Sequence, residues 1–141
     1  MSEPSSDELD RIREQKRKEL RQSSADSEVG GQADEEPPDV PIEVGSQGEF
    51  QHVVSTYDVV LVDCYADWCG PCQHMEPAVE AIAAETDAAV AKLNVDVHGD
   101  VATQLGVRGL PTVIVFSGGE EVERVIGAQD RATLGNMVRT A

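Results

Sequence analysis

The chain has 141 residues, enough for one compact domain with a short additional segment. Its 27 acidic residues outnumber its 11 basic residues, and the net charge of −16 argues against bare nucleic acid as a partner. Lysine occurs only as Lys16, Lys18 and Lys92. An acidic, lysine-poor composition suggests a salt-rich cytoplasm, where high net charge keeps proteins soluble, although many small cytosolic proteins are simply acidic.

The segment MSEPSSDELD at the start is acidic where a secretory signal would be basic, and no apolar core follows it. No run of apolar residues approaches transmembrane length. Three cysteines are an odd number, which argues against a secreted disulfide framework. We therefore expect a cytoplasmic protein without a membrane partner. In that compartment a lone C-x-x-C is more often reactive than structural.

Two N-terminal segments differ from the rest in composition. Residues 1–22 are rich in both acidic and basic side chains, and Ser5 and Glu8 have the spacing of a capping box. Their apolar stripe is thin, so we expect a charged helix that is marginally stable by itself. Residues 23–39 contain no basic residue and hold paired glycines and prolines. This composition predicts an acidic, disordered linker.

From residue 40 to 141 the pattern is that of a globular domain. Nearly continuous apolar runs predict buried strands, and apolar residues at helical spacing predict helices. The order β-α-β-α-β-α-β-β-α predicts an α/β fold, with a central mixed sheet of about five strands flanked by helices. The expected strands are 40–44, 58–66, 88–97, 112–116 and 121–127, and the expected helices are 46–56, the cysteine pair to about 86, 98–106 and 130–141.

The pair Cys69-Gly-Pro-Cys72 lies where a buried strand meets the following helix. Unpaired N–H groups and the helix dipole at that position stabilise a thiolate over a thiol. Pro71 suits the first helical turn, because its missing N–H is not needed there. Cys69 is nearer the exposed end and is therefore expected to attack disulfides. Cys72, one turn further, is expected to resolve the mixed disulfide.

Two other interpretations of the cysteine pair are weaker. A structural zinc site usually needs four ligands, but the chain has no second pair, and His74 is poorly spaced to point with both sulfurs. We therefore expect no metal. A passive structural disulfide would close so short a loop that it would stabilise little.

Asp63 lies in the middle of the apolar run 58–66, and Lys92, the only lysine of the globular region, lies in the neighbouring strand 88–97. Burial would raise the pKa of Asp63, which could then remove the proton from Cys72 near neutral pH. The alternative is an acid at a hydrated strand end, and the residues alone do not decide between the two. Lys92 could pair with Asp63, or it could be a solvated side chain at an edge.

Three further residues lie near this chemistry. Trp68, the only tryptophan, either shields Cys69, offers an apolar contact or simply packs. Cys64 is most simply a small core residue. Pro111 suits the first position of a strand or a tight loop, and the sequence leaves the isomer of the Leu110–Pro111 bond open.

Together these residues resemble the thioredoxin family. The segments LVDCYADWCGPCQHMEP, AKLNVDV, GVRGLPT and IGA occur in the order and spacing of that family, from about residue 40 to the C-terminus. The helix-kinking Pro77 and Gly127 also match. Tyr65 stands where the family usually has a large aromatic, often tryptophan, and Cys64 replaces a typical core phenylalanine. Residues 1–39 have no counterpart in the minimal domain.

The resemblance implies the thioredoxin fold, with the cysteines at the start of the second helix and a cis bond before Pro111. It implies that Asp63 and Lys92 form the buried proton-transfer pair. It also implies that the backbone around residues 108–110 holds a substrate segment by strand-like hydrogen bonds. The implied contact surface consists of Trp68, Gly70, Pro71, Arg108, Gly109, Leu110, Pro111 and Gly127.

The activity implied by the resemblance is that of a protein-disulfide reductase, which cycles between the Cys69–Cys72 disulfide and the dithiol. Its partners would be a thioredoxin reductase, which supplies electrons, and oxidised client proteins. We expect no cofactor other than the redox-active disulfide, and a monomer. The alternative is a thioredoxin-fold binding or adaptor module that acts through its charged N-terminal helix.

Overall fold

The computed structural model of the protein describes residues 36–141. The charged helix predicted at 1–22 and most of the linker predicted at 23–39 lie outside these residues. Residues 36–39, the described end of that linker, belong to no helix or strand. Within residues 36–141, no helix has the length and apolar character needed to cross a membrane.

The described residues contain a five-stranded mixed sheet with the order β1-β3-β2-β4-β5. Strands β1 and β2 run parallel to β3, whereas β4 is antiparallel to β2 and β5 is antiparallel to β4. The prediction of a central mixed sheet is confirmed, and β2 lies at its centre. The strands are β1 (Ile42–Glu43), β2 (Val59–Tyr65), β3 (Ala89–Asn94), β4 (Thr112–Ser117) and β5 (Glu120–Ile126).

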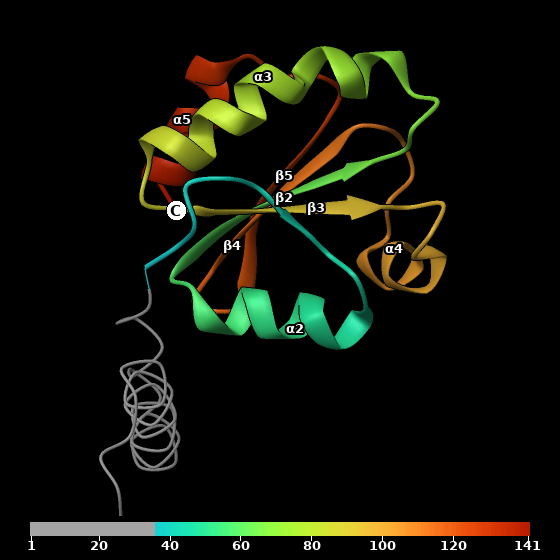
Figure 1. The fold of residues 1–141 in the computed structure, drawn as a ribbon, viewed down its shortest axis with the longest axis horizontal. Helices are drawn as coiled ribbons and strands as arrows, with labels where there is room; N and C mark the ends of the chain where they lie inside the picture. Colours follow the sequence, from blue (N-terminus) through green and yellow to red (C-terminus); the bar gives the residue numbers. More distant parts are fainter. Residues whose placement is uncertain (1–35) are drawn as a thin grey trace, which may run out of the picture. The chain divides into compact units, whose positions relative to one another are not determined.

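Helices cover both faces of the sheet, with α3 and α5 on one face and α2 and α4 on the other (Figure 1). Side chains of α2 pack with one buried cluster of the sheet, and those of α3 and α5 pack with a second. These four helices and five strands follow the predicted order. The helices are α2 (Gln47–Thr56), α3 (Gly70–Glu85), α4 (Gly99–Leu105) and α5 (Arg131–Arg139).

Strand β2 is buried on both faces, as its apolar run predicts, and successive side chains point to opposite sides. Val60, Val62 and Cys64 join the cluster on the α2 side, and Leu61 joins the cluster on the α3 side. Cys64 is thus a core residue, as expected. The same alternation assigns Asp63 to the α3 side, the side of the helix that carries the cysteines.

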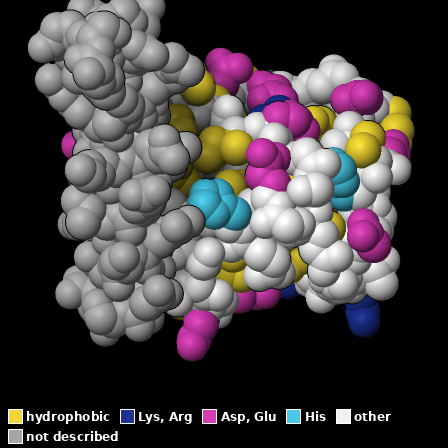
Figure 2. Space-filling view, turned by 60° about the horizontal axis from the view of Figure 1, so that its bottom comes forward, with side chains coloured by type: hydrophobic (Ala, Val, Ile, Leu, Met, Phe, Trp, Pro, Cys, Tyr) yellow, Lys and Arg dark blue, Asp and Glu magenta, His cyan; other side chains and the backbone are white. Residues whose placement is uncertain are grey.

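The surface of the described residues is strongly acidic. Figure 2 shows one face on which acidic side chains are scattered and basic side chains are few. Strand β5 illustrates this pattern, since its exposed side chains include Glu120, Glu121 and Glu123 at the outer edge of the sheet. Charged edge strands resist pairing with other chains.

Candidate active site

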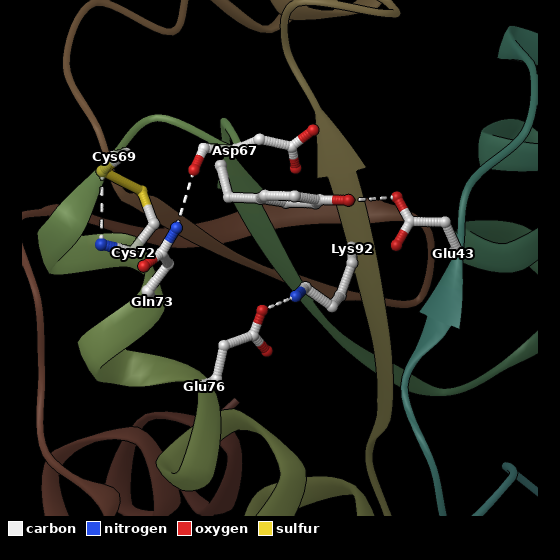
Figure 3. Close-up of polar contacts among 8 residues, drawn as sticks. Glu43, Asp67, Cys69, Cys72, Gln73, Glu76 and Lys92 are labelled. Carbon is white, nitrogen blue, oxygen red and sulfur yellow. Dashed lines mark hydrogen bonds and ion pairs between the residues drawn. A yellow bond between two sulfur atoms is a disulfide. The ribbon is translucent and has the colours of Figure 1, made fainter.

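Cys69 and Cys72 are joined by a disulfide at the start of α3, with their Cα atoms 5.3 Å apart (Figure 3). Cys69 is the N-cap residue of the helix, and its sulfur accepts a hydrogen bond of 3.2 Å from the backbone N–H of Cys72. Pro71 occupies the first turn, as predicted. In the reduced protein, the same N–H and the helix dipole would stabilise a thiolate on Cys69.

The two sulfurs differ in access to a surface groove. Both cysteines are almost fully buried, but only Cys69 lines the groove, which has a volume of about 600 Å³. Trp68 forms one wall and is 71% exposed, so it offers an apolar contact surface instead of packing in the core. Its indole N–H donates a hydrogen bond of 2.8 Å to Asp96, which fixes the ring beside Cys69.

Six of the eight predicted contact residues line this groove together with Cys69. The structure adds three apolar residues that sequence reasoning missed. Val107 belongs to the motif GVRGLPT, Val95 lies in the turn after β3, and Ala102 lies in α4. The predicted residues are Trp68, Gly70, Pro71, Arg108, Gly109 and Leu110, and the additional ones are Val95, Ala102 and Val107.

Pro111 and Gly127 do not line the groove. Pro111 is buried, and the Leu110–Pro111 bond is cis, as the resemblance implies. The backbone N–H of Gly127 donates a hydrogen bond of 2.7 Å to the carbonyl of Pro111. Gly127 has a φ of 106°, which only glycine adopts readily. Their hydrogen bond therefore ties the residue before β4 to the residue after β5.

Asp63 is fully buried, and its carboxylate oxygens have no hydrogen-bond partner among the described residues. Burial raises its pKa from the ordinary 3.8 to about 7; the Lys92 ammonium opposes this, and Glu76 and Glu43 add to it. Of the two interpretations of Asp63, the desolvated acid agrees with this burial and the hydrated strand end does not. Such a group can accept and return a proton near neutral pH.

Lys92 is the register partner of Asp63 on the neighbouring strand, but its ion pair is with Glu76 on α3 (Figure 3). Its side chain is 12% exposed, and its ammonium lies 4.3 Å from the centre of the Tyr65 ring. Lys92 is thus not a solvated edge residue, and it forms its ion pair with Glu76, while its charge still lowers the pKa of Asp63. The ion pair forms because a carboxylate from the helix above the sheet reaches the ammonium.

Sequence reasoning missed Glu76, Tyr65 and Glu43 as members of this polar group. The Tyr65 hydroxyl donates a hydrogen bond of 2.6 Å to Glu43, so the group extends from α3 across the sheet to β1. A signal for Glu76 was present, because it follows Cys72 by four residues and so shares its helix face. Nothing in the sequence indicated that Glu43 would meet Tyr65.

No group of three or more His, Cys, Asp or Glu within residues 36–141 could hold a metal ion. The described residues support the chemistry of the sulfur pair itself, with the buried acid Asp63 on the face of the sheet that α3 covers.

Comparisons with known proteins agree with this geometry. The sequence model of the thioredoxin family matches residues 41–140. A thioredoxin from Chlamydia caviae is 38% identical over 98 residues, which cover 69% of this chain and 95% of that protein. A bifunctional thioredoxin reductase/thioredoxin from Mycobacterium leprae is 43% identical over 97 residues, or 67% of this chain but only 21% of that protein.

A solved structure, that of a mutant thioredoxin from Halobacterium salinarum, has a TM-score of 0.72 and 51% identity. The match covers 74% of this chain and 92% of that one. The fold, the cysteine pair and these relatives lead to one conclusion. The chain belongs to the thioredoxin family, and it is a thiol–disulfide reductase.

Proposed function

We propose that Cys69 is the attacking thiol of this reductase and Cys72 the resolving thiol. The observation that carries the proposal is the position of Cys69, which caps α3 and alone of the two sulfurs lines the groove. The Cys69 thiolate attacks one sulfur of a client disulfide, which forms a mixed disulfide and releases the other client sulfur as a thiolate. That thiolate takes a proton from solvent.

Cys72 then attacks the Cys69 sulfur, which forms the Cys69–Cys72 disulfide and releases the second client thiolate. In sum, two electrons pass from the dithiol to the client disulfide. The proton of Cys72 must leave before it attacks, and Asp63 is the acceptor, because its pKa of about 7 lets it take up and release a proton at neutral pH. Lys92 is the cation nearest to this acid in the described sheet.

The groove is the site where a client would bind. Its lining includes residues 108–110, whose backbone could pair with an extended client segment as a short strand. Most of the other lining residues are apolar, Trp68 and Val107 among them. Such a surface would accept many sequences, because backbone hydrogen bonds and apolar contacts make few demands on side chains.

The donor of electrons, in this proposal, is a thioredoxin reductase. The Mycobacterium leprae relative supports it, since its name joins a thioredoxin reductase and a thioredoxin in one protein. The site of action would be a cytoplasm, and the net charge of −16 would suit a salt-rich one. We also propose that the protein works as a monomer on oxidised client proteins.

Reduction of insulin by the full chain, with dithiothreitol as electron source, tests the proposed roles. Cys69→Ser should abolish the catalysed rate, and Cys72→Ser should accumulate mixed disulfides with insulin. An unchanged rate in the first variant would contradict the role of Cys69, and an absence of mixed disulfides in the second would contradict that of Cys72. Replacing dithiothreitol by a thioredoxin reductase tests the donor, and no reduction would contradict it.

A further inference from the structure

In the polar group around Lys92, the lysine does not form its ion pair with the acid that lies opposite it on the neighbouring strand. Lys92 and Asp63 occupy paired positions on adjacent parallel strands, so their side chains leave the sheet on the same side. Neighbouring strands lie about 4.8 Å apart, which brings the lysine side chain within reach of the carboxylate. Nevertheless the ammonium pairs with Glu76, and both Asp63 oxygens are left without a hydrogen bond among the described residues.

Two contacts hold Lys92 in this position. The carboxylate of Glu76 binds it from α3, and the Tyr65 ring lies 4.3 Å from its ammonium. Tyr65 is itself held by its hydrogen bond to Glu43 on β1. The ring supplies only a weak attraction, about 1 kcal/mol at a partly exposed site. Glu76 is therefore the main group that competes with Asp63 for the lysine.

We propose that Glu76 is a positioning residue, which holds the Lys92 ammonium on the α3 side and so keeps the buried Asp63 carboxyl unpaired and able to accept the proton of Cys72. A carboxylate in a full ion pair with Lys92 would have a lower pKa and would therefore accept the proton of Cys72 poorly. This inference rests on the proposed role of Asp63, but it makes a separate claim about which residue controls that acid.

The charged and titratable groups that face Asp63 come from three elements. Lys92 lies on β3 and favours the ionised acid; Glu76 on α3 and Glu43 on β1 favour the protonated acid. Cys72 lies at the start of α3 and is in disulfide form here. Because the disulfide does not titrate, the oxidised protein isolates the titration of Asp63 from that of the thiols.

The test follows the carboxyl carbon of Asp63 by NMR across a pH titration of the oxidised full chain. In Glu76→Gln, Lys92 loses its partner and can turn to Asp63, so the midpoint should fall by about one pH unit. The matched control is Glu80→Gln, which removes the same charge from an exposed position one turn further along α3 and should leave the midpoint unchanged.

The same substitution in a chain that lacks the lysine shows whether Glu76 acts through Lys92. In Lys92→Met the midpoint should rise, and adding Glu76→Gln to that variant should change it by much less than in the natural sequence. An unchanged midpoint in Glu76→Gln, or an equal fall in both backgrounds, would overturn the proposal. Neither result would affect the roles of Cys69 and Cys72, because the titration involves no turnover.

The same variants give a kinetic readout in the reduced protein. The rate at which Cys72 resolves a mixed disulfide should follow the ionisation of Asp63. Its pH profile in Glu76→Gln should therefore shift to lower pH by the amount seen in the NMR titration. A profile that does not move while the NMR midpoint falls would contradict the role of Asp63 as acceptor, but not the control that Glu76 exerts on it.

Discussion

The two faces of β2 place neighbouring residues in opposite surroundings. Cys64 points to the α2 side, where it is enclosed by apolar residues; burial and the nearby Asp63 raise its pKa to about 12, so it stays a neutral thiol. Asp63 points to the α3 side, toward the elements that carry Lys92, Glu76 and the cysteine pair. One strand thus separates a face that only packs from a face that also carries proton chemistry.

The two faces of the sheet also differ in what they contribute to the stability of the fold. On the α2 side the buried hydroxyl of Thr56 has a hydrogen-bond partner in His52, whereas the α3 side retains a carboxylate without a hydrogen bond. A buried acid of this kind lowers stability whenever it is ionised. Substitutions on the α2 side should therefore lower the stability of the fold and leave disulfide reduction unchanged. Substitution of Asp63 should raise the stability and slow the reaction.

The largest effect is expected from Phe50→Ala on the α2 side. Phe50 is buried and makes an edge-to-face contact with Phe116, with ring centres 5.8 Å apart. Its removal should lower the free energy of unfolding by about 3 to 5 kcal/mol in urea denaturation. Insulin reduction per folded molecule should be unchanged. A loss of activity in the folded variant would show that the two faces are not separate in function.

A smaller effect, of opposite sign, is expected from Asp63→Asn. The pKa of Asp63 in the folded protein, about 7, exceeds its ordinary value of 3.8, so the folded state binds the proton more tightly. In the natural protein, the buried Asp63 destabilises the fold only when it is ionised. This destabilisation is absent below about pH 4, grows as the pH rises, and is complete above about pH 7. At 1.36 kcal/mol for each pH unit between the two pKa values, the destabilisation amounts to at most about 4 kcal/mol.

The measurement is urea denaturation of the oxidised natural protein and of Asp63→Asn from about pH 4 to about pH 9. The stability of the variant relative to the natural protein should increase over this range, while the variant resolves mixed disulfides more slowly. If the difference between the two proteins did not depend on pH, Asp63 would have to be ionised to the same extent in the folded and unfolded states.

The smallest expected effect is that of salt on stability, because salt screens exposed charges much more than buried ones. In about 1 M salt the exposed acidic residues should repel one another less, so both the natural protein and Asp63→Asn should become more stable. The difference between them should remain, because a buried charge is screened little. Denaturation curves at low and high salt check this. A stability independent of salt would remove the support for a salt-rich cytoplasm.

The order of the elements and the position of the cysteine pair could be predicted from the sequence, since both depend on local patterns. The run around Asp63 showed a buried strand, and the spacing after Cys72 showed a helix. The partner of Lys92 could not be predicted in this way. Strand pairing brings it beside Asp63, but the choice of Glu76 depends on how closely α3 packs on the sheet.

The groove was predictable only in part, for a related reason. Its residues near the cysteines and in the motif GVRGLPT belong to continuous segments, whereas Val95 and Ala102 reach it from a loop and a helix that are separate in the sequence. Pro111 and Gly127 were predicted as members of the contact surface, but they are hydrogen-bonded to each other and do not line the groove. Sequence spacing does not distinguish a lining residue from a supporting one.

The sulfur that caps α3 is also the sulfur that lines the groove. Any change in its oxidation state therefore changes the bond that begins the helix. In a closed thermodynamic cycle, the redox form that unfolds less readily is the form that folding favours at the cysteine pair, by the same free energy. The difference in unfolding free energy between the oxidised and reduced chains, measured by calorimetry, therefore gives the contribution of the fold to the dithiol–disulfide equilibrium of its cysteines.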